Sequence, residues 1–335
     1  MVHLRQPMFL LMFLLILFWN ASFSALASEV KPHEFHLVKP QQVLTIMSWN
    51  MEWFGAPQRP RTAADTQYFS GIIRQIAPEI IAFQEIDNSS ALQQILPDHQ
   101  YRIFMSDRQG QLREGFQDGN QYTGFAVKRT LRITDPKDLA DLNIRHAPAS
   151  GEKPRRGRLR YGAYVIVYPE SGPPLHLLSV HLKSGCFSRA ASQRSASCRV
   201  LGYQAEVLSG WISQRLTRKE SFLISGDFNH RMAEPGSWLF TSLAEQGGDK
   251  DSVRLLTKDV NASCYVRLSR RGKKTEYRHY KKLIDHFVAS ADVAGAAQRG
   301  LVYQFSFPRE DVSRYNLSDH CPVVLRLPLP SAHMQ

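Results

Sequence analysis

The chain has 335 residues, of which 43% are hydrophobic, and it carries a formal net charge of +12. This length suits one large α/β domain, and the hydrophobic content excludes a chain that is disordered throughout. No segment repeats at a fixed period, which excludes a repeat architecture. The basic balance favours partners rich in phosphate, such as nucleic acid, anionic lipid or polyanionic metabolites.

The N-terminal segment predicts export. Arg5 precedes an unbroken apolar run from Met8 to Trp19, and Ala25-Leu26-Ala27 supplies the small residues that a signal peptidase requires. A membrane anchor is the alternative, but a helix over this run covers only about 18 Å of the ~30 Å hydrocarbon core. We therefore expect a cleaved signal peptide over 1–27, a polar leader over 28–42 and one catalytic domain over 43–330. The mature protein would be periplasmic or secreted, without stable membrane insertion.

Apolar, β-prone runs alternate with helical patterns along the chain. We expect strands at 43–49, 79–86, 124–128, 161–168, 175–182, 222–225 and 322–327. Thr62 is placed to cap a helix that runs to Ile76, and residues 198–211 carry apolar side chains at helical spacing. Residues 264–290 are typical of a hairpin with its turn at 271–273. The order of these elements predicts an α/β sandwich with mixed sheets in one domain.

Four cysteines, Cys186, Cys198, Cys264 and Cys321, allow three pairings if all form disulfides. An oxidising compartment favours disulfides over free thiols. Cys186 and Cys198 lie in one loop rich in serine and arginine, so we predict a bridge between them and leave the state of the other two open. Zinc binding is disfavoured because no C-x-x-C or H-x-x-x-H spacing occurs.

Short polar clusters stand at the ends of the apolar strands. In chain order they contain Asn50, Glu85, His181 with Lys183, Asp227 with Asn229, Asp285 with His286, and Asp319 with His320. Each cluster is weak evidence alone, because Asn and Asp also form turns and a lone histidine is usually structural. Together they provide the oxygen ligands that Mg²⁺ or Mn²⁺ prefers and imidazoles that transfer protons near neutral pH.

These clusters lie within six motifs that resemble a known series. In chain order the motifs are SWNMEWFG (48–55), IIAFQEID (80–87), SVHLKSG (179–185), ISGDFNHRM (224–232), LIDHFVAS (283–290) and LSDHCPVV (317–324). They resemble the motifs of the endonuclease/exonuclease/phosphatase superfamily, which includes DNase I-like nucleases, sphingomyelinases and inositol polyphosphate 5-phosphatases. The resemblance covers roughly 43–328. It implies a four-layer α/β sandwich of two facing mixed β-sheets flanked by helices.

The resemblance also implies a cation site. Glu85 would be the main ligand of Mg²⁺ or Mn²⁺, Asn50 would help to hold the cation, and Asp319 would add a carboxylate near it. Ca²⁺ is a further option as a structural ion.

The same resemblance implies the catalytic roles. His320 would activate water or stabilise the attacked phosphate, and Asp285 would fix its tautomer. Asp227 and Asn229 would contact the scissile phosphate, with His181 acting opposite His320. This chain departs from the pattern after Asp285, where His286 replaces the aromatic residue that is often found there, and we interpret His286 as structural.

The choice of substrate depends on charge, because the superfamily hydrolyses DNA, RNA, sphingomyelin and phosphoinositides. The basic runs 153–160 and 267–282 favour nucleic acid, although the second is also compatible with a solvated hairpin face. We expect phosphate contacts from Lys183, Arg271, Lys273 and Lys274. The prediction is an exported, metal-dependent, monomeric nuclease. A sphingomyelinase-type or phosphoinositide-type lipid hydrolase is the alternative, and a non-catalytic binding module is a third reading.

Overall fold

The computed structural model describes residues 42–329, with the exception of 112, 117–118, 148–151, 153–154, 189–194, 246–250, 269–273 and 299. The predicted signal peptide, the leader up to residue 41, Arg271 and Lys273 therefore lie outside the described residues. Within the described ranges, no helix combines the length and the apolar character that crossing a bilayer requires.

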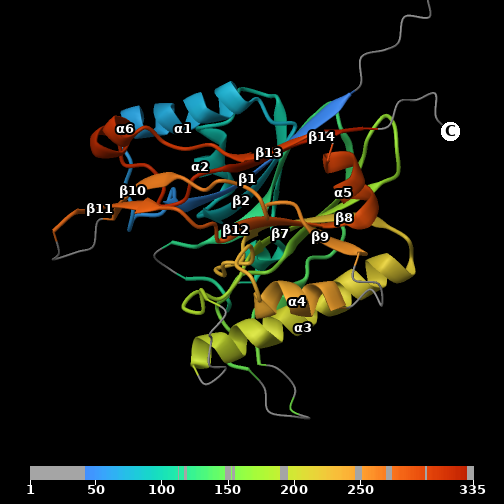
Figure 1. Ribbon diagram of the computed structural model, residues 1–335. Helices are drawn as coiled ribbons and strands as arrows, with labels where there is room; N and C mark the ends of the chain where they lie inside the picture. Colours follow the sequence, from blue (N-terminus) through green and yellow to red (C-terminus); the bar gives the residue numbers. More distant parts are fainter. Residues whose placement is uncertain are drawn as a thin grey trace, which may run out of the picture. The chain divides into compact units, whose positions relative to one another are not determined.

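Two six-stranded mixed sheets form the centre of the fold (Figure 1). The first sheet contains, in spatial order, β13 (Leu301–Gln304), β14 (Val323–Pro328), β1 (Val43–Phe54), β2 (Ile80–Ile86), β4 (Tyr122–Lys128) and β3 (Tyr101–Met105). The second contains β5 (Arg132–Thr134), β6 (Ala163–Tyr168), β7 (Leu175–His181), β8 (Ser221–Asp227), β12 (Asp285–Ser290) and β9 (Val253–Leu255). Pairing is parallel between β1 and β2 and between β7 and β8, and antiparallel between the other described neighbours.

Helices cover the outer faces of both sheets. The first sheet is covered by α1 (Ala63–Ile76), α2 (Ser89–Gln93) and α6 (Arg309–Arg314), and the second by α3 (Ala196–Thr217) and α4 (Trp238–Ala244). The remaining helix, α5 (Ala291–Ala297), packs on the apolar layer between the sheets. Two short 3₁₀ turns lie at Asp107–Gly110 and Ala140–Leu142. This arrangement confirms the predicted four-layer α/β sandwich.

The apolar core has three layers because each central strand is buried on both faces. On β1, Leu44 and Ile46 point between the sheets, whereas Met47 and Trp49 point toward α1. The Trp49 indole stacks on Phe69 of α1 with 4.7 Å between ring centroids. Burial on both faces explains why the strands appear in the sequence as continuous apolar runs.

The predicted start of α1 is confirmed in detail. The Thr62 hydroxyl accepts a hydrogen bond from the Asp65 N–H at 3.2 Å, and the Asp65 carboxylate accepts one from the Thr62 N–H at 2.8 Å. This reciprocal pair satisfies two N–H groups that the first turn leaves open. The helix ends at Ile76, before Ala77 in the left-handed region (φ 50°) and Pro78.

Several of the predicted elements differ in extent from those of the structure. The helix predicted over 198–211 is longer and spans Ala196–Thr217. The first strand does not end at Trp49 but continues to Phe54, so Asn50 lies inside β1. Residues 264–290 do not form one hairpin: β10 (Cys264–Leu268) pairs with β11 (Glu276–Tyr280), and β12 joins β8 in the second sheet. Every residue of β11 is exposed and every residue of β12 is buried, so the chain leaves the surface between them.

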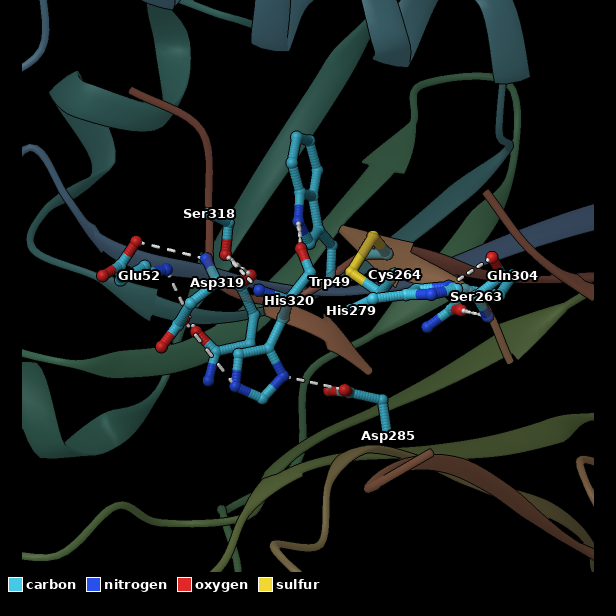
Figure 2. Close-up of a disulfide and its surroundings, with 12 residues drawn as sticks. Trp49, Glu52, Ser263, Cys264, His279, Asp285, Gln304, Ser318, Asp319 and His320 are labelled. Atoms are coloured by element: carbon cyan, nitrogen blue, oxygen red, sulfur yellow. Dashed lines mark hydrogen bonds and ion pairs between the residues drawn. A yellow bond between two sulfur atoms is a disulfide. The ribbon is translucent and has the colours of Figure 1, made fainter. Parts of the chain in front are cut away.

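Two disulfides cross-link the described part of the chain. The predicted bridge between Cys186 and Cys198 is confirmed, with 5.2 Å between the Cα atoms. The second bridge joins Cys264, at the start of β10, to Cys321, with 5.8 Å between the Cα atoms. Figure 2 shows this bridge together with His320, the residue next to Cys321 in the chain. The β10–β11 hairpin is thus covalently attached to the segment that carries His320.

Candidate active site

At one end of the sandwich, the side chains between the sheets change from apolar to polar. On β8, Leu223 faces the inner layer, and Ser225 and Asp227 follow on the same face because strand side chains alternate. By the same alternation β1, β7 and β12 place Asn50, His181 and Asp285 on this inner face. Buried polar groups are costly unless they are paired or hold a ligand, so this end of the inner layer is the candidate site.

Strand register brings His181, Asp227 and Asp285 side by side. His181 on β7 and Asp285 on β12 are both register partners of Asp227 on β8. The Asp227 Oδ2 lies 3.4 Å from His181 Nε2 and accepts hydrogen bonds from Asn229 Nδ2 (3.0 Å) and Asn50 Nδ2 (3.2 Å). Burial raises the pKa of Asp227, an effect that His320 opposes. Asp227 is therefore the central acceptor of the site.

Backbone strain is concentrated around this centre. Among the described residues, seven non-glycine residues have positive φ, and four of them border the site: Glu52 (47°), Trp53 (53°), Glu85 (59°) and Asn229 (51°). Such conformations cost on the order of 1–3 kcal/mol each and cluster at functional sites. Gly226 also has positive φ (140°), and a Cβ there would lie 2.0 Å from the Val180 carbonyl oxygen, so only glycine fits beside β7.

A bulge in β2 aims Glu85 at the site. Regular alternation would place Glu85 on the helix-covered face with Ile81 and Phe83. Instead, the left-handed backbone at Glu85 and the register shift after Phe83 turn its carboxylate toward Asn50, whose Nδ2 lies 3.3 Å from Oε1. The other carboxylate oxygen accepts the Trp53 N–H at 3.1 Å. Burial and the charge of Asp319 raise the pKa of Glu85.

His320 and Asp285 form an oriented pair. His320 Nδ1 lies 2.8 Å from Asp285 Oδ2, and the Trp49 indole N–H donates to the His320 carbonyl at 3.0 Å (Figure 2). The free Nε2 lies 3.8 Å from Asp227 Oδ2 and 3.8 Å from Asp319 Oδ1. Although burial disfavours the charged imidazole, Asp285 and Asp227 raise the pKa of His320 well above its ordinary value.

His181 has the opposite electrostatic environment. Its Nε2 lies 3.6 Å from Glu85 Oε1, and within the described residues its buried Nδ1 has no hydrogen-bond partner. Burial, followed by the charges of Arg160 and His320, lowers the pKa of His181 well below its ordinary value. The site therefore holds one imidazole that favours the charged form and one that favours the neutral form, which suits two different proton-transfer roles.

Sequence reasoning missed Glu52 and Arg160. The Glu52 carboxylate accepts the Asp319 N–H at 3.2 Å and pairs with Arg59 at 3.0 Å, and burial and Asp319 raise its pKa. Burial lowers the pKa of Arg160 to about 10, against the opposing effect of Glu85 and Asp227. Glu52 lies two residues after Asn50, and this spacing indicates a shared strand face. Arg160 belongs to a basic run, and the sequence does not distinguish it from the other basic residues of that run.

The carboxylates around Glu85 fit a divalent cation. Burial and the charge of Asp319 raise the pKa values of Glu85 and Glu52, and a bound cation would relieve both effects. Asn50 presents Nδ2 to the carboxylates, while its Oδ1 accepts the Glu52 N–H at 3.0 Å. Its amide must therefore turn before the oxygen becomes a cation ligand.

A second grouping with metal-ligand geometry is formed by Asp227, Asp285 and His320, whose ligand atoms lie within 4.8 Å of one another. In this grouping the imidazole proton already occupies the space between Asp285 and His320. A cation there would have to displace that proton, whereas beside Glu85 it requires only that the Asn50 amide turn. The geometry thus favours the Glu85 side.

The remaining predicted residues lie farther from the centre or outside the described ranges. Lys183 is half-buried at the mouth of the site, with Nζ 2.9 Å from the Ser184 carbonyl. Lys274 is exposed beyond the turn end of the β10–β11 hairpin, whose paired strands extend about 14 Å from the Cys264–Cys321 bridge. Arg271 and Lys273 are in the part of this turn that the structure does not describe.

Within the described part of the chain, the contacts of His286 are those of a structural residue. Its Nδ1 lies 2.8 Å from the Thr257 hydroxyl, and its Nε2 lies 3.3 Å from the Met232 amide nitrogen. Burial lowers its pKa to about 3. It faces neither Asp285 nor the inner polar layer, because successive strand residues point to opposite faces.

Comparisons with known proteins agree with this architecture. The endonuclease/exonuclease/phosphatase family matches residues 47–320. A structure of an endonuclease/exonuclease/phosphatase from Bacteroides vulgatus has 13% identity and a TM-score of 0.57, over 87% of this chain and 100% of that one. Truncated TDP2 from Caenorhabditis elegans has 15% identity and a TM-score of 0.53, and the match covers 85% of this chain and 97% of that one. A mannosyl-6-phosphatase from Bacteroides thetaiotaomicron has 12% identity and a TM-score of 0.50, over 85% and 99%. No curated protein sequence gave a significant match.

Proposed function

The chain belongs to the endonuclease/exonuclease/phosphatase family, whose members hydrolyse phosphoester bonds, and from this premise we propose that it is an exported, divalent-cation-dependent nuclease. The observation that carries the proposal is the oriented His320–Asp285 pair, with Nε2 facing Asp227 at the polar end of the inner layer. Hydrolysis of a phosphodiester needs an activated water, neutralisation of phosphate charge and a proton for the leaving oxygen. The side chains around Asp227 are arranged to serve each of these needs.

In the proposed mechanism the neutral form of His320 takes a proton from the attacking water through Nε2, and Asp285 and Asp227 stabilise the imidazolium that forms. Asp285 accepts a hydrogen bond from the Nδ1–H group and so fixes the tautomer and the ring orientation. The charge of Arg160 stabilises the negative charge that develops on the phosphate oxygens, and Asn229 holds the Asp227 carboxylate in place through its amide. His181, on the opposite side of Asp227, is placed to hydrogen-bond the leaving oxygen.

A divalent cation, Mg²⁺ or Mn²⁺, would be held by Glu85, with Asp319 and Glu52 near it and Asn50 as an orienting or ligating group. When bound, the cation supplies charge neutralisation to the phosphate. Asn50 and the Trp53 N–H keep the Glu85 carboxylate in one orientation, so the site is organised before substrate arrives.

Charge supports nucleic acid as the substrate class. The net charge of +12 and the basic residues near the site favour a polyanion over a neutral or zwitterionic lipid. Six large apolar side chains are exposed in the described residues: Val43, Phe116, Phe187 and Leu301, together with Tyr277 and Tyr280 of β11. A lipid hydrolase would benefit from a contiguous apolar patch to enter a membrane surface.

A substrate panel tests this proposal. Wild type and His320→Asn would be incubated with plasmid, single-stranded DNA, RNA, sphingomyelin vesicles and a phosphoinositide, each with Mg²⁺, Mn²⁺ or EDTA. We expect cation-dependent cleavage of nucleic acid that His320→Asn lowers by about 10³-fold or more. His99→Asn, an exposed histidine with left-handed φ that asparagine tolerates, is the matched control. Intact nucleic acid with both cations at low salt would reject the nuclease, and phosphocholine release would favour the lipid hydrolase.

Export needs a separate measurement. We expect the mature chain to begin at Ser28 and to be recovered outside the cytoplasm. N-terminal sequencing of protein from the periplasmic and medium fractions tests this, and an intact Met1 in the membrane fraction would instead support an anchor.

A further inference from the structure

A cavity of about 720 Å³ opens beside the candidate active site. Six basic residues line it: Arg113, Arg145, Arg156, Arg158, Arg160 and Lys183. Among the described residues, its lining contains two aromatic residues, Trp53 and Phe116, and no acidic residue. Its size lies in the range of ligand pockets, ~300–1,000 Å³.

The cavity shares a wall with the catalytic centre. Trp53 lines the cavity, and its N–H donates to Glu85 Oε2 at 3.1 Å. Gln121, another lining residue, hydrogen-bonds the Glu85 side chain. Arg160 lines the cavity and acts electrostatically on Glu85 and Asp227. A ligand in the cavity is therefore contiguous with a phosphate bound at Glu85 and Asp227.

The positive charge of the cavity is mostly uncompensated. In the described part of the chain, Arg156 alone among the six forms an ion pair, with Asp141 at 3.2 Å. Burial and the neighbouring Arg160 lower the pKa of Lys183. Like charges around a concave surface repel one another and concentrate a positive potential, which an anionic ligand relieves. This composition excludes an apolar ligand and favours phosphate groups.

The aromatic residues narrow the ligand class further. Phe116 is 41% exposed, and the Arg158 guanidinium lies 5.1 Å from its ring centroid. Exposed rings and guanidinium planes next to basic groups stack on unpaired bases while the cations hold the backbone. A closed duplex offers no free base face to such a concave site.

We propose that this cavity binds a nucleotide of a single-stranded nucleic acid, adjacent to the scissile phosphate. Arg145 and Arg158 contact its phosphates, and Phe116 stacks on its base. The inference rests on the proposed function for the identity of the polymer, but its test measures binding and not cleavage.

The test uses the mature chain with Mg²⁺ in a His320→Asn background, which prevents cleavage. Fluorescence anisotropy would compare labelled dT10 with a duplex of equal length over a series of salt concentrations. We expect the duplex to bind at least about tenfold more weakly. Arg145→Gln with Arg158→Gln should raise the Kd for dT10 about tenfold and reduce the slope of log K against log salt by about 1.4, or about 0.7 for each lost contact.

Arg129→Gln with Arg132→Gln is the matched control, because it removes two exposed charges at the opposite end of β4 and β6. We expect it to leave the affinity and the salt slope unchanged. An equal loss in the control would mean that net charge, and not the cavity, binds the strand. Wild-type affinity in the cavity variant, or equal affinity for duplex and single strand, would also overturn the proposal.

A third variant tests stacking. Phe116→Leu should weaken binding of dT10 about tenfold but leave binding of an abasic decamer unchanged, and equal losses for both would refute the stacking role. A protein that binds single strands through the cavity but cleaves no nucleic acid would reject the proposed function and keep this inference. Cleavage of nucleic acid that is unaffected by the cavity variants would support the proposed function and reject this inference.

Discussion

The Cys264–Cys321 bridge offers a quantitative test, because the chain contains a second bridge for comparison. The sequence separations are 57 residues for this bridge and 12 for Cys186–Cys198. The chain-entropy relation for loops of these lengths gives about 4 kcal/mol of stabilisation for the first and about 3 kcal/mol for the second. Replacing each pair by alanine should therefore destabilise the protein in that order, as measured by chemical denaturation.

The two variants should differ more in activity than in stability. Cys321 follows His320, and without the bridge this segment depends on hydrogen bonds such as those from the Ser318 hydroxyl to the Asn50 carbonyl (2.7 Å) and from the Trp49 indole to the His320 carbonyl (3.0 Å). A displacement of about 1 Å at a catalytic group costs about 10²-fold in rate. We expect C264A/C321A to lower kcat between about tenfold and 10²-fold.

The assay is hydrolysis of bis(p-nitrophenyl) phosphate at a temperature where circular dichroism shows all variants folded. C186A/C198A is the control and should keep near wild-type kcat, because its loop carries none of the proposed catalytic residues. Full activity in folded C264A/C321A would show that the bridge does not position His320. A larger stability loss in C186A/C198A would refute the loop-length argument.

Three further predictions follow from the site and the core. Asp285→Asn keeps the size of the side chain but removes the charge beside His320, so kcat should fall by about 10³–10⁴-fold with little change in unfolding temperature. Initial rates and calorimetry measure these two effects. A variant that keeps its activity would contradict the proposed pairing of Asp285 with His320. Removing cations with EDTA should abolish hydrolysis, and Mg²⁺ should raise the unfolding temperature of wild type but not of Glu85→Gln; an equal shift in both would place the cation elsewhere. His286 has a folded pKa of about 3 against about 6.5 when unfolded, so its contribution to stability is complete above pH 6.5 and is lost as pH falls toward 3, by about 1.4 kcal/mol per pH unit. His286→Phe should flatten the dependence of unfolding free energy on pH between 5 and 6.5, and an unchanged slope would reject this assignment.

Much of the fold could be predicted because its signals are local. The buried strands are short apolar runs, and the start of α1 depends on Thr62 and Asp65, which are three residues apart. The two-residue spacing of Asp227 and Asn229 is likewise a local signal, and it predicted that both belong to the site. The short edge strands β3, β5, β9 and β13 could not be predicted, because three to five residues on a sheet edge carry little periodicity.

Other features depend on contacts that the sequence does not record. The separation of β11 from β12 follows from the burial of β12 against β8, which lies far away in the chain. Glu85 reaches the site only through a bulge, and alternation from Phe83 would place it on the wrong face. Arg160 looked like one member of a basic run, because only the folded structure shows its proximity to Glu85 and Asp227.

The position of β14 has a consequence for biosynthesis. β14 fills the gap between β13 and β1, and the segment before it carries Asp319 and His320. A nascent chain that stops short of this segment has an open edge on β1, a template for pairing with other chains, and it has no histidine to place beside Asp285. Catalytic competence and protection from aggregation are thus acquired in the same late step of folding. A hydrolase assembled in this order is inactive until the last strand is in place.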